Sequence, residues 1–361
     1  MEKKKVIVSG MRPTGKLHLG NYWGALKNYI ELQDKYECYF FIADWHSLTT
    51  YSENSTSIKE NTIAMVSDWL SAGLDANKCV IFRQSDVKYH AELYLLLGMI
   101  TPISWLLRNP TFKEQLVELY RQKYKGQEDK MKKAEGSFAK IAENYGFTQE
   151  ESMALNSELT NYGFLGYPVL QAADILLYGA SHVPIGKDQL PHLELSREIA
   201  RRFNHIFKTQ VFIEPQAILT QSPYLPGIDS RKMSKSYKNV IELSDFGDRL
   251  ESKIKSMYTD PKKIRLNDKG NPDGCVVYAF HKLYNPESEK RAVECRSGSI
   301  GCGQCKKHLF NLMNPEMLKI NENRNKYDKD MIEKILEAGK VKANSAAKNM
   351  MEKINKEVRL I

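Results

Sequence analysis

Short apolar strands alternate with amphipathic helices over the first hundred residues, and few folds accommodate that order. The pattern predicts strand 5–9, helix 22–32, strand 38–42, helix 58–70, strand 80–83 and helix 91–100. The alternation resumes with helix 167–178, strand 183–185 and helix 190–203. Parallel strands need a crossover connection, which a helix supplies. We therefore predict an α/β fold with a doubly wound, Rossmann-type parallel sheet.

Two regions break the alternation. Residues from about 111 to 160 are rich in Lys and Glu, and we interpret them as a polar helical insertion. Such a stretch is either a solvated helical surface or an RNA contact. After about residue 241 no parallel-sheet pattern remains, and helical spacing returns at 331–338 and 343–358. We predict a catalytic domain at 1–240 and a mostly helical second domain at 241–361.

The charge balance favours a polyanionic partner. The 361 residues contain 53 Lys and Arg against 44 Asp and Glu, a net charge of +9. Such an excess favours RNA or a nucleotide phosphate. The first residues, MEKKKVIVSG, lack a secretory core, and no stretch approaches membrane-spanning length. We therefore expect a cytoplasmic protein without a membrane partner.

The loop at 13–21 joins the first strand to the first helix, where a doubly wound sheet opens a ligand crevice. Gly15 and Gly20 allow a close backbone approach, and the helix start directs its free N–H groups at the loop. His18 can donate to a phosphate oxygen. This pattern indicates a phosphate-binding loop, with an inert surface histidine as the alternative interpretation of His18.

A second candidate loop lies far downstream at 231–238. Its sequence, RKMSKSYK, places four cations among eight residues, with small hydroxyl side chains between them. A loop of this kind can close over a triphosphate and neutralise the charge that develops on departing pyrophosphate. The alternative interpretation is a plain solvated basic loop.

Together the two loops resemble the paired signatures of class I aminoacyl-tRNA synthetases. Residues 18–21, HLGN, are similar to the "HIGH" motif, and residues 232–236 match the "KMSKS" motif. Asn21 replaces the last histidine, as in the tryptophanyl and tyrosyl branch, so Asn21 must supply another donor. The resemblance implies catalytic roles for His18, Asn21, Lys232 and Lys235. It implies that ATP contacts Arg12, Pro13, Thr14, Gly20, Asn21, Gly186, Lys187, Asp188, Lys232, Met233, Ser234, Lys235 and Ser236.

Residues 166–178 and 183–189 are similar to the amino-acid-binding half of bacterial tryptophanyl-tRNA synthetases. Asp174 has apolar neighbours in the sequence, and burying a carboxylate there is costly unless a group donates to it. An indole N–H would do so. The resemblance implies that Asp174 binds the indole, while Tyr167 and Gln189 hold the ammonium and carboxylate end of tryptophan.

Two features leave other interpretations of this segment open. Gln171 lies one helical turn before Asp174, and this Gln-x-x-Asp pair also resembles the phenol-binding pair of tyrosyl-tRNA synthetases. Asp174 could instead pair with a nearby Lys or Arg. His46 follows a strand and either lines the same cleft or is a structural histidine.

Four cysteines crowd into one later segment: Cys275, Cys295, Cys302 and Cys305. Four thiolates suffice for a closed zinc site or one iron–sulfur cluster. The segment resembles one in a subset of bacterial tryptophanyl-tRNA synthetases that carries a [4Fe-4S] cluster in the C-terminal domain. We expect the cluster, with zinc and unligated buried thiols as alternatives. Its expected task is to order the segment that meets the tRNA anticodon, and a redox sensor is the alternative.

The resemblance implies an enzyme that activates L-tryptophan with ATP and Mg²⁺ and transfers it to tRNA(Trp), as a homodimer. Three alternatives remain at this point. They are a tyrosyl-tRNA synthetase, a non-catalytic RNA-binding paralogue, and an adenylyl-transferring enzyme that makes a small metabolite.

Overall fold

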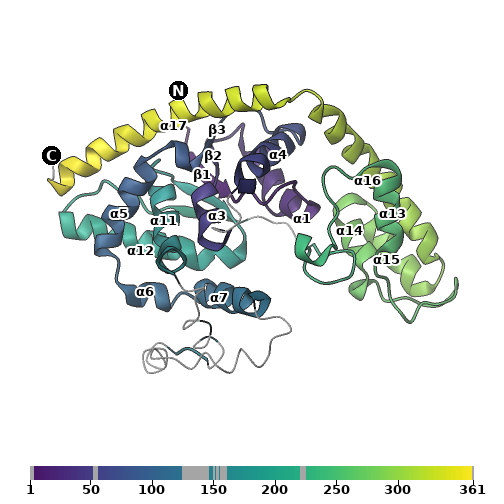
Figure 1. Cartoon of the computed structure of the whole chain (residues 1–361). Coiled ribbons are helices and arrows are strands. Elements are labelled where there is room, and N and C mark those ends of the chain that lie inside the picture. Colours follow the sequence, from purple (N-terminus) through teal and green to yellow (C-terminus); the bar gives the residue numbers. More distant parts are fainter. Residues whose placement is uncertain are drawn as a thin grey trace.

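The computed structural model describes residues 4–51, 56–123, 146–148, 151, 154, 161–219 and 225–359. A sheet lies between helical layers, a second helical unit lies beside it, and one long helix leaves this unit and runs along the sheet (Figure 1). Most of the predicted insertion at 111–160 lies outside the described residues. Its described beginning is helix α7 (Pro110–Lys123).

The sheet has five parallel strands in the order β3-β2-β1-β4-β5. The strands are β1 (Val6–Met11), β2 (Glu37–Ile42), β3 (Cys79–Arg83), β4 (His182–Ile185) and β5 (Gln216–Leu219). The predicted doubly wound sheet is therefore confirmed. Because the chain order reverses at β1, the carboxyl ends of β1 and β4 form the switch point where ligands bind in such folds.

Helices cover both faces of the sheet, as the alternate burial in β1 shows. Ile7 packs in one core cluster with Leu26 and Trp69, whereas Val8 packs in the other with Phe203. The first face carries α1 (Leu19–Asn21), the π-helical turn η1 (Tyr22–Leu26), α2 (Lys27–Leu32) and α4 (Ile58–Ser71). The second face carries α5 (Tyr89–Ile100), α11 (Tyr162–Leu176) and α12 (Leu190–Phe207), while α3 (Asp44–Tyr51) and α6 (Ile103–Leu107) contact α11.

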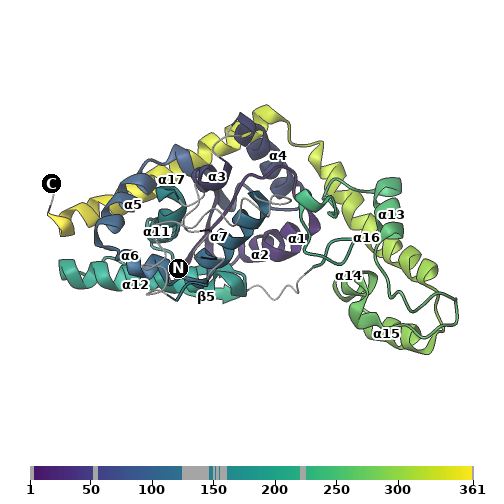
Figure 2. The ribbon, with the colours of Figure 1, turned by 60° about the horizontal axis from the view of Figure 1, so that its bottom comes forward.

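The helical unit contains α13 (Gly247–Ser256), α14 (Val276–Tyr284), α15 (Ser288–Ser297) and α16 (Cys302–Arg324). The final helix, α17 (Lys329–Val358), leaves this unit and lies along the sheet (Figures 1 and 2). It contacts the edge strand β3 as well as α4 and α5. The two helices predicted at 331–338 and 343–358 are thus one. The division near residue 240 stays a prediction, and α17 packs with the sheet rather than with α13–α16.

None of the helices in the described part of the chain is long and apolar enough to cross a membrane.

Candidate functional site

The first loop leaves β1 at Met11 and enters α1 at Leu19, and it is fixed to the segment that follows the second loop. The Leu19 N–H donates to the Ile241 carbonyl at 2.8 Å, and the Leu243 N–H donates to the Leu17 carbonyl at 2.9 Å. Gly15 has φ +93°, a left-handed conformation that favours glycine. Backbone hydrogen bonds therefore hold the two loops, which are far apart in the sequence, next to each other in the fold.

His18 caps α1 reciprocally with Asn21. The Asn21 backbone N–H donates to His18 Nδ1 at 3.3 Å, and the His18 N–H donates to Asn21 Oδ1 at 3.2 Å. The pKa of His18 is lowered to about 4, mainly by burial and also by nearby Lys235, while Glu242 opposes both. The imidazole is therefore neutral near pH 7, with its proton on Nε2 because Nδ1 accepts. The Asn21 carboxamide oxygen is used as a hydrogen-bond acceptor in this helix cap.

The second loop touches the first directly. Lys235 Nζ donates to the Thr14 carbonyl at 2.6 Å, and the Gly20 N–H donates to Met233 Sδ at 3.4 Å. Burial lowers the pKa of Lys235, against the attraction of Glu242 and Asp68. The structure therefore brings together the two segments that the sequence singled out.

Buried Asn239 braces the second loop from behind. Its Nδ2 donates to Asp229 Oδ1 at 2.7 Å and to the Lys232 carbonyl at 3.0 Å, while its Oδ1 accepts from the Ser234 N–H at 2.8 Å. The sequence did not mark Asn239 as a site residue, because the match to the KMSKS motif ends at Ser236.

A cavity of about 750 Å³ opens between the two loops. Its lining includes these predicted ATP contacts: Arg12, Pro13, Thr14, Asp188, Lys232, Met233, Ser234, Lys235 and Ser236. His18, which is predicted to be catalytic, also lines it. The sequence analysis missed Asn61 of α4 and Gln115 and Glu118 of α7, which also line it. Four other predicted ATP contacts are not among the described residues that line this cavity. Gly186 lines a second cavity beside it, and Gly20, Asn21 and Lys187 line neither of the two.

That neighbouring cavity, about 410 Å³, lies over the switch point. All five predicted amino-acid-binding residues line it: His46, Tyr167, Gln171, Asp174 and Gln189. Apolar lining comes from Val8, Phe41, Ala43, Phe164, Ile175, Val183 and Ile185. Four residues line both cavities: Arg12, Gln115, Asp188 and Gln189. The two cavities therefore adjoin at these four side chains.

Asp174 is 1% exposed and accepts hydrogen bonds on both carboxylate oxygens. Its Oδ2 lies 2.8 Å from His46 Nε2, and its Oδ1 lies 2.6 Å from His90 Nδ1. Gln84 Nε2 donates to Oδ1 at 2.8 Å and to Oδ2 at 3.0 Å. Burial acts to raise the pKa of Asp174, but the hydrogen bonds from His46 and His90 outweigh it and leave the pKa below its usual value. Asp174 is therefore an ionised acceptor.

At the other end of this cavity, two predicted polar residues have protein partners. The Tyr167 hydroxyl lies 2.8 Å from His192 Nε2, and Gln189 Nε2 donates to Asp188 Oδ2 at 2.8 Å. Burial lowers the pKa of His192 to about 4, so this imidazole is neutral. Tyr167 is thereby fixed in orientation, while half-buried Gln189 contacts only its neighbour in the chain through this bond.

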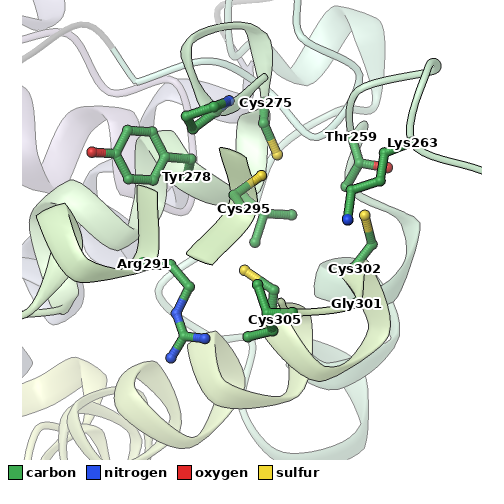
Figure 3. A pocket seen from close by; sticks show the side chains of 12 residues that line it. Thr259, Lys263, Cys275, Tyr278, Arg291, Cys295, Gly301, Cys302 and Cys305 are labelled. Carbon is green, nitrogen blue, oxygen red and sulfur yellow. The ribbon is translucent and has the colours of Figure 1, made fainter. Parts of the chain in front are cut away.

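All four clustered cysteines line one small cavity in the helical unit. They come from the start of α14, from α15 and from the first turn of α16, and their sulfur atoms point toward a common space (Figure 3). Lys263 and Arg291 line the same cavity. Within the described ranges, no group of three or more His, Cys, Asp or Glu is placed to hold a metal ion. The four predicted thiols are thus brought together around one cavity.

The fold, the paired loops and the adjoining cavities define a class I aminoacyl-tRNA synthetase. The family model "tRNA synthetases class I (W and Y)" matches residues 1–315. The tryptophan–tRNA ligase of Aquifex aeolicus is 44% identical over 98% of this chain and 99% of its own length, and that of Thermotoga maritima has the same identity and coverage. The chain belongs to the tryptophan–tRNA ligase family, which confirms the predicted tryptophanyl branch over the tyrosyl one.

A solved structure supports the same assignment. Tryptophanyl-tRNA synthetase from Campylobacter jejuni, complexed with ADP and tryptophan, is 30% identical with a TM-score of 0.76, covering 98% of this chain and all of that one.

Proposed function

We propose that this chain activates L-tryptophan with ATP, releasing pyrophosphate, and then transfers the tryptophanyl group to tRNA(Trp). The observation that carries the proposal is the junction of the two cavities at Arg12, Gln115, Asp188 and Gln189. A nucleotide in the larger cavity and an amino acid in the smaller one would meet there, α-phosphate against carboxylate.

The first step needs alignment and charge stabilisation rather than a protein nucleophile. The tryptophan carboxylate attacks the α-phosphorus in line, the bond to pyrophosphate breaks, and tryptophanyl-adenylate forms. His18 donates through Nε2–H, and Lys232 and Lys235 neutralise the charge on the leaving pyrophosphate. Asn21 takes part by orienting His18 through the reciprocal cap. In the second step, the 2′-hydroxyl of the terminal tRNA adenosine attacks the adenylate carbonyl and AMP leaves.

Mg²⁺ fits this site as a partner of the phosphates. Glu118 and Asp188 are carboxylates that line the nucleotide cavity, and protein-bound Mg²⁺ commonly uses one or two carboxylates together with substrate phosphates. The ion would neutralise triphosphate charge when bound.

Asp174 supplies the specificity for tryptophan. It lies at the apolar amino-acid cavity as an ionised acceptor, where an indole N–H can bind it. A ring without a donor would leave that charge poorly paired, and sites of this kind reject such analogues by about 10⁴-fold.

The four cysteines fit a [4Fe-4S] cluster better than zinc. The thiolates of such a cluster each bind a different iron, so they lie farther apart than four ligands of one ion. Lys263 and Arg291 beside the cavity suit a group with net negative charge. Cys275, Cys295, Cys302 and Cys305 would hold the cluster, which would order the helical unit that we expect to contact the tRNA anticodon.

Metal analysis of protein purified without oxygen tests this part of the proposal. We expect about four iron atoms per chain and no stoichiometric zinc. One zinc and no iron would establish the alternative.

A homodimer is also part of the proposal. Leu95, Met99, Ile103 and Tyr162 are between 57% and 74% exposed on α5, α6 and α11, and α11 contacts both other helices. Exposed apolar side chains on adjoining helices are typical of a subunit interface, and we assign this one to a second copy of the chain. Charging tRNA would place the enzyme in the cytoplasm.

The decisive experiment is tryptophan-dependent ATP–pyrophosphate exchange, followed by charging of tRNA(Trp). Exchange without charging would favour an adenylyl-transferring enzyme of another kind. Neither activity would indicate a non-catalytic paralogue. Repeating the exchange with tyrosine measures specificity directly.

A further inference from the structure

The donors around Asp174 fall into two groups by exposure. Gln84 and His90 are 0% exposed and do not line the amino-acid cavity, whereas the His46 side chain is 11% exposed and lines it. Gln84 and His90 therefore hold Asp174 from behind. His46 contacts it from the side where a ligand would arrive.

The rear donors form a network that continues away from the cavity. His90 Nε2 lies 2.8 Å from the hydroxyl of buried Tyr178, whose ring stacks on Tyr39 at 4.7 Å between centroids. Gln84 Oε1 has no hydrogen-bond partner within the described residues, although it is buried. The Gln84 amide is thus oriented by Asp174 alone, and this orientation leaves the Gln84 carboxamide oxygen without a hydrogen bond. An unpaired buried acceptor of this kind is unusual and calls for a functional explanation.

Proton positions in the network follow from the acceptors. The carboxylate has about four lone-pair positions, and the Gln84 amide and His90 Nδ1–H fill most of those at the rear. His90 Nδ1–H donates to the carboxylate, and the Tyr178 hydroxyl lies at the other ring nitrogen, Nε2. Asp174 is therefore surrounded by donors and has no proton to give. On the cavity side, one position on Oδ2 is taken by His46, which lines the cavity whereas Gln84 and His90 do not.

We propose that His90, supported by Tyr178 and together with Gln84, determines specificity by keeping Asp174 an acceptor only, with His46 holding the place that the substrate N–H takes. They are positioning residues, because they act through Asp174 rather than on the substrate. This inference rests on the proposed function, in which tryptophan is the amino acid bound.

Comparing two substrates separates this role from a general structural one. The first is tryptophan, and the second is its isostere in which sulfur replaces the indole N–H. Both fill the cavity, but only tryptophan donates to Asp174. We expect the wild-type enzyme to favour tryptophan by about 10⁴-fold in kcat/KM for pyrophosphate exchange.

Substitution of His90 should reduce that preference. His90→Leu removes one of the two donors to Oδ1, and we expect kcat/KM for tryptophan to fall about 50-fold, mainly through KM, while the value for the sulfur isostere changes less than fivefold. His90→Asn keeps an N–H near the Nδ1 position and should restore most of the preference. The matched control is Tyr39→Phe, which removes a hydroxyl from the ring stacked on Tyr178 and should leave the preference intact.

The outcomes are separable. Equal losses for both substrates in His90→Leu, or no rescue by His90→Asn, would overturn the proposal and leave His90 a structural residue. A wild-type enzyme without tryptophan-dependent exchange would instead overturn the proposed function. If His90→Leu does not fold, Tyr178→Phe carries the test: we expect a fivefold loss of preference, and an unchanged preference contradicts the inference.

Discussion

Lys235 joins the two nucleotide loops through a single hydrogen bond. Its Nζ donates to the Thr14 carbonyl at 2.6 Å, and burial lowers its pKa. A lysine that is already partly desolvated and placed between the loops can follow the triphosphate as its charge moves to pyrophosphate. Lys238, three residues later, is exposed and lies outside the cavity lining within the described residues.

Lys235→Ala should therefore slow adenylate formation much more than it weakens tryptophan binding. Loss of one preorganised charge-stabilising donor typically lowers kcat by about 10²–10³-fold. We expect that loss in ATP–pyrophosphate exchange, with the dissociation constant for tryptophan changing less than about threefold in equilibrium binding. Lys238→Ala is the control and should exchange at nearly the wild-type rate. Unchanged exchange in Lys235→Ala would refute the assignment of this loop.

Some residues of the site could be predicted from the sequence, and others could not. His18 and Lys235 were recognisable because they lie within continuous motifs. Asn61, Gln115 and His90 come from helices that the fold brings to the site, and no local pattern marks such positions. The donor role predicted for Asn21 rested on residue type alone, whereas its oxygen is used in the cap.

Among the elements, α17 explains how an open sheet edge is protected. The edge strand β3 is covered by this helix at Gly339, where an added Cβ would lie 1.8 Å from the Ile81 carbonyl oxygen. Only glycine permits that approach. Covering an edge strand also prevents it from pairing with another chain.

Gly339→Ala should separate α17 from β3 and destabilise the protein. Overpacking against backbone atoms costs about 3 kcal/mol, and we expect a loss of that size in the free energy of unfolding by denaturant titration. Ala338→Val adds carbon atoms one position away on the exposed side of α17, and should change stability by less than about 1 kcal/mol. Equal stability of Gly339→Ala and the wild type would show that α17 does not seal the edge.

The elements found from the sequence are those with strong periodicity. Four strands and the principal helices of the sheet region match the prediction, because buried parallel strands and amphipathic helices each leave a distinct apolar pattern. Strand β5 was missed because it is short and its end residues, Gln216 and Leu219, are exposed. The π-helical turn Tyr22–Leu26 could not be anticipated, since it retains nearly helical spacing.

At the scale of the whole molecule, one apolar core extends from the sheet into the helical unit. The cluster that contains Ile7 and Phe40 also contains Phe280 of α14 and Met313 of α16. Polar contacts cross the same boundary: Trp23 Nε1 donates to the Tyr284 hydroxyl at 2.9 Å. Partial unfolding of either unit would therefore expose the core of both.

On the other face of the sheet, buried His192 of α12 should make the stability of the protein sensitive to acid. Burial lowers the pKa of His192 to about 4, from about 6.5 when exposed. Below pH 6.5 the imidazole binds a proton in the unfolded chain but stays neutral in the folded chain. The contribution of His192 to the free energy of unfolding is therefore complete above pH 6.5 and is lost as the pH falls toward 4. Between pH 7.5 and pH 5.0 this histidine alone should account for about 2 kcal/mol of lost unfolding free energy.

Denaturant titrations at those two pH values check the expectation in a matched pair of variants. His192→Gln removes the buried imidazole, so its stability should fall about 2 kcal/mol less than that of the wild type on acidification. His205→Gln, on the exposed side of the same helix α12, should keep the full wild-type dependence. If both variants lose stability as the wild type does, protonation of His192 is not what couples pH to folding. The acid sensitivity would then arise from other groups, such as His18 and His281, whose pKa values are also lowered to about 4, mainly by burial.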